Sequence, residues 1–307
     1  MKLVCISGVK FGYEVIKHIL ERNYNISVIF SYNKSVQEKH SDSVSFKNLS
    51  NQYNIRNVEV DNINNPENIE ILKAVKPDLI LVMGWSQILK AKIIEIPSIG
   101  IIGSHPTELP KYRGRAPIPW SIIKGLKQSA ETFFWIAEGT DSGDILDQQI
   151  FLISDEDDAN SIYNKVTEAA KVMIIENLDL IERGIIRKSK QDETKFLEYW
   201  PKRTPEDGKI DWTQDGKNIH RLVRASTKPY PGAFTFFKGS QLIIWKVKYS
   251  DERSQGSGVI MSVNDNDVKI GTGKGVISLI KVSWKNNIIV SPQKIFSKED
   301  IGVTIGG

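Results

Sequence analysis

One histidine of this 307-residue chain directly follows an apolar run that predicts a buried strand. The run covers residues 99–104 (IGIIGS), and His105 comes next. An imidazole has an unperturbed pKa near ~6.5, so it can give or take a proton near neutral pH. His105 is therefore the first candidate for acid–base chemistry. We interpret the remaining histidines as structural or solvated, because they lie in helical or polar stretches: His18, His40 and His220.

The loop after His105 combines a stiff backbone with positive charge. Pro106 and Pro110 restrict the loop, and Gly114 allows a ligand to approach the backbone. Three cations lie within five residues: Lys111, Arg113 and Arg115. Guanidinium groups bind oxyanions bidentately, so the cluster fits phosphate recognition. It fits a solvated charged turn equally well.

Two carboxylates lie further on, in the segment 138–146 (EGTDSGDIL). Asp141 and Asp144 bracket a Ser-Gly pair, a pattern typical of an ordinary turn ahead of a strand. No second cluster of ligand-type residues accompanies them, so we predict no metal site.

The elements that must position these residues alternate along the first half of the chain. Strands are predicted at 2–7, 26–30, 57–60, 78–83 and 99–104. Helices are predicted at 11–22, 65–75, 86–95, 116–125 and 158–184. The alternation predicts α/β units around a mostly parallel sheet, whose ligands bind beyond the carboxyl ends of the strands. Gly8 and Gly12 do not form a G-x-G-x-x-G dinucleotide fingerprint.

The character of the chain changes after about residue 195. A stretch rich in Pro, Gly and charge, 195–212, predicts a linker, and 218–226 predicts a short helix. Short apolar runs separated by turn residues follow, at 233–237, 241–247, 258–263, 267–273 and 275–284. They predict a small barrel or sandwich of five or six strands. We expect a catalytic domain at 1–195 and a β domain with its linker at 196–307.

The composition limits the classes of function. Cys5 is the only cysteine, which excludes a disulfide framework and favours a reducing compartment. No apolar run approaches the ~18 residues of a membrane span, and the N-terminus does not fit a signal peptide. We therefore expect a cytoplasmic protein that binds no membrane. The net charge of +4 suits a small anionic ligand but does not establish nucleic-acid binding.

The segment 105–117 (HPTELPKYRGRAP), followed by 140–145 (TDSGDI), resembles the folate-dependent formyltransferase family. This family includes methionyl-tRNA formyltransferases, glycinamide ribonucleotide transformylases and sugar N-formyltransferases. His105 and Asp141 match the family histidine and aspartate, with the same interval of 36 residues.

The resemblance continues in the second half of the chain. Residues 203–212 and 222–237 are similar to the second domain of the formyltransferase half of a bifunctional aminoarabinose-modification enzyme. The similarity is weakest over 31–75. It implies a Rossmann-type first domain and a second domain that resembles an open OB-fold barrel.

The resemblance also implies a mechanism, with 10-formyltetrahydrofolate as the formyl donor. The acceptor amine would attack the formyl carbon, His105 would act as base or, when charged, stabilise the oxyanion, and Asp141 would orient it. The implied folate contacts are Met83, Gly84, Trp85, Ile88, Leu89, Gly139 and Asp144. The implied acceptor contacts are Gly103, Ser104, Pro106, Lys111, Tyr112, Arg113 and Arg115, the three cations either ordering the loop or binding phosphate.

The expected acceptor depends on residues 31–46, which lack a basic motif of the tRNA enzymes. The tRNA enzymes of the family carry a basic P-x-G-R-G loop after the second strand, whereas residues 31–46 read SYNKSVQEKHSDSVSF. A nucleotide-linked amino sugar is therefore the expected acceptor. A tRNA acceptor remains the alternative, because small β-barrels often bind nucleic acid. The sequence leaves the oligomeric state open, a homodimer included.

Position 103 departs from the family pattern. The family has asparagine two residues before the histidine, where its amide donates to the oxyanion, and this chain has Gly103. We expect a water or a neighbouring side chain to fill the space, and charged His105 to carry more of the oxyanion's charge. One alternative is a weakened enzyme in which Gly103 is simply tolerated. The other is a catalytically silent relative that binds folate or a sugar nucleotide.

Overall fold

The computed structural model describes residues 1–265, 267–285 and 288–306, and the chain packs into two compact units. The first unit comprises Met1–Pro117, Gln128–Leu152 and Tyr163–Pro201. The second comprises Ile118–Lys127, Ile153–Ile162 and the chain from Lys202 onward. Two short segments that precede residue 163 thus belong to the same unit as the C-terminal part of the chain.

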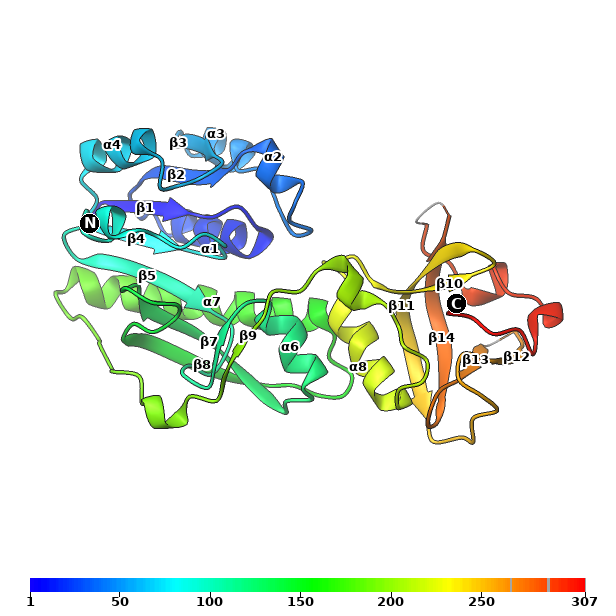
Figure 1. Ribbon diagram of the computed structural model, residues 1–307. Coiled ribbons are helices and arrows are strands. Elements are labelled where there is room, and N and C mark those ends of the chain that lie inside the picture. The colour runs from blue at the N-terminus through cyan, green and yellow to red at the C-terminus, as the bar shows by residue number, and fades with distance from the viewer. Residues whose placement is uncertain (266, 286–287, 307) are drawn as a thin grey trace. The chain divides into compact units, whose positions relative to one another are not determined.

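The first unit is built on a seven-stranded sheet of order β3-β2-β1-β4-β5-β7-β8 (Figure 1). The first five of these strands run parallel, and β7 and β8 are antiparallel to their neighbours. The predicted α/β fold with a mostly parallel sheet is confirmed. The strands are β1 (Leu3–Ile6), β2 (Ile26–Tyr32), β3 (Arg56–Val60), β4 (Leu79–Val82), β5 (Gly100–His105), β7 (Gln128–Trp135) and β8 (Ile145–Leu152).

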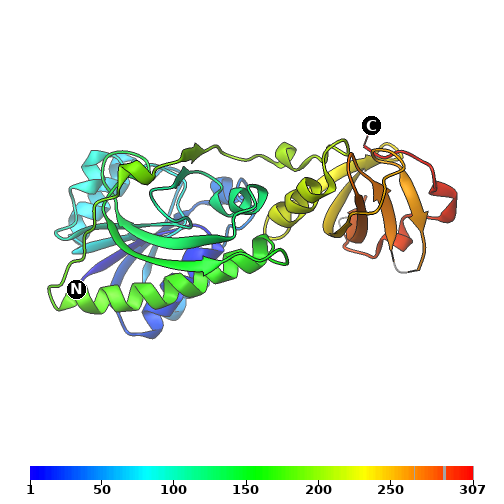
Figure 2. The same ribbon diagram turned by 90° about the horizontal axis from the view of Figure 1, so that it is seen from below.

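Helices cover both faces of this sheet. Side chains of α4 and α5 pack with the apolar residues on one face of the sheet, including Val4 and Ile6. On the other face α7 runs along the sheet (Figure 2) and contacts α1, where the Lys171 ammonium lies 3.5 Å from the Glu14 carboxylate. The helices of the first half are α1 (Lys10–Glu21), α2 (Lys34–Gln37), α3 (Lys47–Gln52), α4 (Pro66–Val75), α5 (Ala91–Ile94), α6 (Pro117–Ile123) and α7 (Ala159–Glu182).

The predicted helix at 86–95 is wrong over its first half, since α5 spans only Ala91–Ile94. Polar side chains hold residues 87–90 in a loop instead. Gln87 bonds the Asp61 carbonyl at 2.6 Å and the Ile63 amide at 3.0 Å. Asn64 bonds the Ile88 carbonyl and the Lys90 amide. These long-range bonds replace those that a helix would make.

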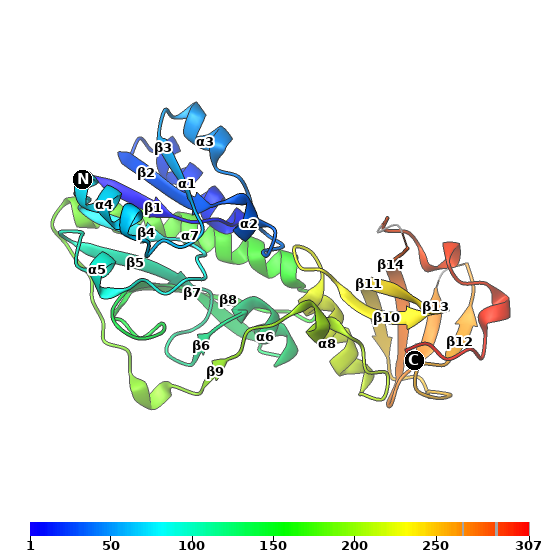
Figure 3. The same ribbon diagram turned by 45° about the horizontal axis from the view of Figure 1, so that its top comes forward.

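A small parallel pair, β6 (Tyr112–Gly114) and β9 (Glu198–Trp200), lies beside the main sheet in Figure 3. Gly114 has a φ of +108°, and a Cβ at this position would lie 2.4 Å from the Trp200 carbonyl oxygen. Only glycine permits that close approach. The pair therefore joins the loop after His105 to a segment that follows α7.

The second unit contains a five-stranded antiparallel sheet of order β10-β11-β14-β13-β12. Its elements are α8 (Gly216–Ser226), β10 (Ala233–Phe237), β11 (Ser240–Ser250), β12 (Ile260–Val263), β13 (Val268–Gly271) and β14 (Val276–Trp284). Each predicted C-terminal strand is present, and valine and isoleucine side chains fill the core. The prediction that this domain resembles an OB-fold barrel stays a prediction.

Two findings concern the described residues only. No helix formed by residues 1–265, 267–285 or 288–306 is long and apolar enough to cross a membrane. Over the same ranges, no three His, Cys, Asp or Glu side chains gather in a way that could hold a metal ion.

Candidate active site

Strand β5 carries His105 to the carboxyl edge of the sheet. The strand pairs with β4 through Gly103 on one side, and on the other side His105 lies opposite Thr132 of β7. Pairing on both sides fixes the backbone, and the His105 residue is only 5% exposed. A buried ring on a fixed backbone has a defined orientation, which acid–base chemistry requires.

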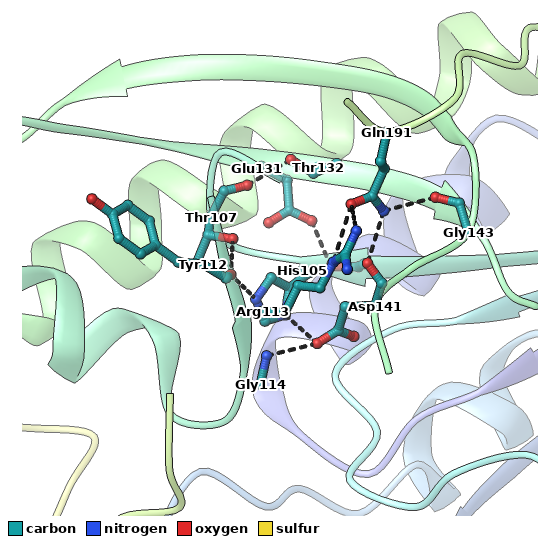
Figure 4. A network of polar contacts seen from close by, with 11 residues as sticks. His105, Thr107, Tyr112, Arg113, Gly114, Glu131, Thr132, Asp141, Gly143 and Gln191 are labelled. Atoms are coloured by element: carbon teal, nitrogen blue, oxygen red, sulfur yellow. Dashed lines mark hydrogen bonds and ion pairs between the residues drawn. The ribbon is translucent and has the colours of Figure 1, made fainter. Parts of the chain in front are cut away.

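The two nitrogens of His105 have different partners (Figure 4). Nε2 lies 3.0 Å from the carbonyl oxygen of Tyr112, which also accepts a 2.6 Å hydrogen bond from the Thr107 hydroxyl. A carbonyl only accepts, so Nε2 must carry the proton. Nδ1 faces Asp141, with 3.7 Å between it and Oδ2. In the neutral ring, Nδ1 is therefore the nitrogen with a free lone pair.

A tight loop brings Asp141 to this nitrogen. Asp141 has a φ of +52°, in the left-handed region that few residues other than glycine adopt. Its Oδ2 accepts a 2.9 Å hydrogen bond from the backbone N–H of Gly114. Next to it, a Cβ on Gly143 would lie 1.7 Å from the Trp135 carbonyl oxygen, so the loop packs directly on β7. The structure thus places the two predicted catalytic residues side by side.

Two of the three predicted cations are neutralised. Arg113 is buried, and its guanidinium binds both carboxylate oxygens of Glu193 and the side-chain oxygen of Gln191. Lys111 pairs with Glu108 at 2.5 Å. Of the two roles set out for Arg113 and Lys111, these contacts support ordering of the loop.

Arg115 differs from the other two cations. Its side chain is exposed, and across the described ranges of the chain no side-chain partner is recorded for it. Its backbone N–H is fixed by a 2.9 Å hydrogen bond to the Trp200 carbonyl, one residue beyond the Gly114 amide that holds Asp141. Arg115 is therefore the cation of the cluster that can meet an anion from solvent.

At Gly103 the space for a side chain is already taken. A Cβ there would lie 2.9 Å from the ring of Phe134 and 3.0 Å from a side-chain carbon of Ile136. A neighbouring side chain therefore fills the position, but it is apolar and donates no hydrogen bond.

The other predicted acceptor residues divide between the interior and the edge of the site. The Ser104 hydroxyl donates to the carboxyl group of Glu131. Half-buried Pro106 directly follows His105, and its carbonyl accepts from Ser129. The Tyr112 ring stacks on Trp200, with 4.5 Å between the ring centroids. Ser104 is thus occupied inside the protein, and Tyr112 acts on His105 through its backbone.

The predicted folate residues after β4 alternate between core and surface. Met83 and Leu89 are buried in the core, so ligand could reach them only through their backbone or after a rearrangement. Ile88 is 73% exposed. Gly84 has a φ of +67°, which lets the chain turn sharply after the strand. In the other predicted folate segment, Gly139 has a φ of +106° and the Asp144 carbonyl accepts from the Trp135 amide.

Trp85 has an unmet polar group. Its indole stacks on the buried ring of Tyr32, with 4.0 Å between centroids, and Tyr32 also stacks on His40. The Tyr32 hydroxyl is held by Ser86. The indole N–H of Trp85 is buried and has no acceptor among the residues that the structure describes. Such a donor is available for a ligand at this edge of the sheet.

Sequence reasoning missed a buried acid next to the site, Glu131 on β7. It is completely buried, Ser104 bonds one carboxyl oxygen, and the other oxygen has no partner in the described ranges. Burial raises its pKa from 4.5 to about 8, although the Ser104 hydrogen bond opposes the shift. No residue pattern indicated it, because a lone glutamate in QSAETFFW is typical of a surface position.

We expect Glu131→Gln to remove part of the pH dependence of stability. Between pH 4.5 and 8 an unfolded chain loses this proton while the folded chain keeps it, so the free energy of unfolding falls as pH rises. From pH 5 to pH 8, wild type should therefore lose on the order of 3 kcal/mol more than the variant. Urea unfolding at both values measures the difference. If the free energy of unfolding of both proteins changes equally between the two pH values, Glu131 is not the group responsible. Glu176→Gln, on the exposed face of α7, is the control and should keep the wild-type pH dependence.

Gln191 is the second residue that the sequence did not reveal. Its side-chain amide donates to the backbone carbonyls of Asp141 and Gly143 at 2.8 and 2.7 Å. It lies 50 residues beyond Asp141 in the chain. Backbone carbonyls leave no mark in a sequence, so no spacing rule could have found this contact.

Comparison with protein-family models gives two matches. Residues 1–178 match the model described as "Formyl transferase", and residues 202–299 match "Formyl transferase, C-terminal domain".

Two curated proteins are similar to this chain over most of its length. The chain is 34% identical over 296 residues to a bifunctional polymyxin resistance protein ArnA from Wigglesworthia glossinidia brevipalpis. That alignment covers 96% of this chain but only 45% of the relative. A methionyl-tRNA formyltransferase from Caldanaerobacter subterraneus subsp. tengcongensis is 32% identical over 278 residues, covering 88% of this chain and 89% of the relative.

Among solved structures, an N-formyltransferase from Helicobacter canadensis has the same fold. It aligns with a TM-score of 0.68 at 18% identity, over 91% of this chain and 99% of the other. Its crystals contained folinic acid and dTDP-3-aminofucose. HypX from Aquifex aeolicus aligns with a TM-score of 0.69 at 22% identity, over 96% of this chain and 47% of that one.

Proposed function

The chain belongs to the formyl transferase family, and we propose that it transfers the formyl group of 10-formyltetrahydrofolate to the amine of a nucleotide-linked amino sugar. We assign catalysis to residues 1–195, and we assign residues 196–307 to a linker and an OB-like β domain. We also propose a cytoplasmic enzyme of polysaccharide biosynthesis.

The observation that carries the proposal is the pairing of His105 with Asp141. Because Nε2 is committed to the Tyr112 carbonyl, Nδ1 can take the proton of the acceptor amine as the amine bonds to the formyl carbon. The same proton can then pass to the folate nitrogen as its bond to the formyl carbon breaks. The imidazolium that results faces the Asp141 carboxylate at 3.7 Å, and opposite charges at this distance stabilise each other in a buried site. The positive charge of His105 then also stabilises, through space, the negative charge that develops on the formyl oxygen.

The residues at the edge of the sheet fit the folate group. When bound, 10-formyltetrahydrofolate supplies an activated formyl carbon. Trp85 offers a buried indole N–H without an acceptor, and exposed Ile88 offers an apolar contact. Gly84 and Gly139 both have positive φ values, so the backbone turns sharply on each side of this edge. We propose that this edge binds the donor.

The segment between β2 and α3 favours a small acceptor over tRNA. Residues 33–46 hold two lysines, one glutamate and one aspartate, and so carry no net charge. The segment is fastened to the turn between β1 and α1, since the Val44 amide donates to the Gly8 carbonyl at 3.1 Å and the Lys10 amide donates to the Asp42 carbonyl at 2.9 Å. Binding of tRNA needs an excess of cations that meet phosphates. In the cation cluster after His105, Arg115 is the exposed member, and one such cation suits the diphosphate of a sugar nucleotide better.

An assay with several acceptors tests the proposal. Purified protein is incubated with 10-formyltetrahydrofolate and UDP-, dTDP- or GDP-linked amino sugars, and mass spectrometry looks for formylated sugar. Methionyl initiator tRNA belongs in the same panel, because the full-length relative from Caldanaerobacter is a methionyl-tRNA formyltransferase. If only the tRNA is formylated, the acceptor is tRNA and the proposed sugar nucleotide is wrong. Binding of folate without formylation of any acceptor would support a silent relative.

We expect Gly103→Asn to give no large gain in rate. The new side chain meets the Phe134 ring and Ile136, and the charge of His105 already stabilises the oxyanion. Gly103→Asn combined with Phe134→Leu provides the missing room, and Phe134→Leu alone is the control. A 100-fold gain in the double variant, about 2.7 kcal/mol of transition-state stabilisation, would show that the site lacked a donor.

A further inference from the structure

A segment that returns from α7 to β9 borders the site. We call residues 183–197 the strap. Ser189 exchanges backbone hydrogen bonds with Ile145 at 2.7 and 2.9 Å, and the Arg187 carbonyl accepts from the Trp135 indole at 2.9 Å. The strap is therefore attached to both antiparallel strands that flank the Asp141 loop.

Gln191 is the strap residue that faces this loop. Its amide nitrogen donates to the Asp141 and Gly143 carbonyls, and its oxygen accepts from Nε and a terminal nitrogen of Arg113. Carbonyls only accept and a guanidinium only donates, so the orientation of the amide is unambiguous. All four hydrogen-bonding positions of the amide are used.

Arg113 fixes Gln191 in turn. The guanidinium is 4% exposed, and buried charge needs partners. Glu193, also on the strap, binds it bidentately, and the Phe196 ring lies 5.4 Å from its central carbon. Gln191 therefore sits against a rigid, charge-paired support.

The loop that Gln191 holds is one that would otherwise relax. A non-glycine residue in the left-handed region costs about 1–3 kcal/mol unless its surroundings impose it. Asp141 has this conformation, and its carboxylate must meet both the Gly114 amide and His105. The two carbonyl contacts of Gln191 lie directly on this turn.

We propose that Gln191 is a positioning residue that acts on formyl transfer through Asp141. This inference rests on the proposed function of the His105–Asp141 pair. On the loop, Gln191 bonds two backbone carbonyls and no side chain. Gln191 therefore fixes the position of the Asp141 carboxylate rather than its charge. Its removal should lower turnover without weakening the binding of either substrate.

Two substitutions separate positioning from simple attachment of the strap. We expect Gln191→Ala to lower kcat about 10- to 100-fold, because a displacement of about 1 Å can cost that much, and to leave both KM values within about twofold. Gln191→Glu keeps a partner for Arg113 but turns a carboxylate oxygen toward two carbonyls. Gln191→Glu should be at least as slow as Gln191→Ala. Recovery of activity in Gln191→Glu would mean that only the bond to Arg113 matters, and would overturn the proposal.

A double-variant comparison tests the route of the effect. In the Asp141→Asn background, Gln191→Ala should cause no further loss, because its only effect on the reaction passes through Asp141. Multiplied losses would overturn the proposal. Asp192→Asn is the matched control and should behave like wild type, because among the described residues the Asp192 carboxylate bonds only Thr194 and Lys195 on the strap.

A measurement that needs no activity keeps the two proposals distinguishable. The Gly114 amide hydrogen should exchange slowly in wild type and faster in both Gln191 variants, because the Asp141 carboxylate that accepts it moves away. Unchanged protection would overturn the positioning role. If instead Asp141→Asn keeps full activity while Gly114 exchange accelerates in the Gln191 variants, Gln191 still fixes the Asp141 turn, but the catalytic assignment of Asp141 fails and with it the effect of Gln191 on formyl transfer.

Discussion

His105→Ala should lose about 10²–10⁴-fold in turnover while the chain still folds, because the variant lacks the group that takes the amine's proton. The fold should survive, since the Tyr112 carbonyl keeps its hydrogen bond from Thr107 when the imidazole is removed. No buried acceptor is left unpaired at that point. The measurement is formyl transfer at saturating donor and acceptor, together with circular dichroism.

The control for this variant is His18→Ala. His18 lies on α1, far along the chain from the site, and its Nδ1 is 4.0 Å from Glu21. It should keep wild-type turnover. Added imidazole should restore part of the activity of His105→Ala, because the vacated space is shaped for the ring. Near-normal turnover in a folded His105→Ala protein would remove His105 from the mechanism.

Asp141→Asn should lower turnover over the same range, about 10²–10⁴-fold, for an electrostatic reason. The asparagine oxygen can still accept from the Gly114 amide, so the loop keeps its shape. The negative charge opposite Nδ1 is lost, and the imidazolium formed during the reaction is no longer stabilised.

The losses in turnover caused by these two substitutions should not multiply. Residues that act as one unit lose about as much singly as together, so His105→Ala with Asp141→Asn should be no slower than His105→Ala alone. A product of the two losses would mean that Asp141 works independently of the histidine. Donor affinity, measured by fluorescence titration, should stay unchanged in each variant.

Apolar periodicity predicted the parallel strands well, because four of the five are short, mostly buried runs bounded by turn residues. It missed β7 and β8 for a physical reason. Strand β7 buries Glu131 inside the protein, and β8 is the last strand of the sheet with polar residues exposed along it. A pattern that counts apolar residues fails where a buried strand carries an acid or an edge strand faces water.

The candidate site shows the same division. The positions of His105 and Asp141 followed from a motif and its interval, which are properties of the sequence. The cation cluster was ambiguous because charge alone does not distinguish a solvated arginine from one buried against a distant partner. Arg113 meets Glu193 across 80 residues of chain, and that pairing depends on the fold.

The three residues of β6 also set a time at which the enzyme can begin to work. Tyr112 and Gly114 hold the catalytic pair, but β6 is paired with β9, which ends at Trp200. A ribosome makes the whole seven-stranded sheet well before that strand leaves the exit tunnel. A nascent chain of about 180 residues would already possess His105 and Asp141 but would lack β9 and Gln191, which support β6 and the Asp141 loop, since contacts between distant parts of a chain form late. Synthesis of the last residues of β9 would therefore switch on catalysis in a body whose sheet had folded earlier.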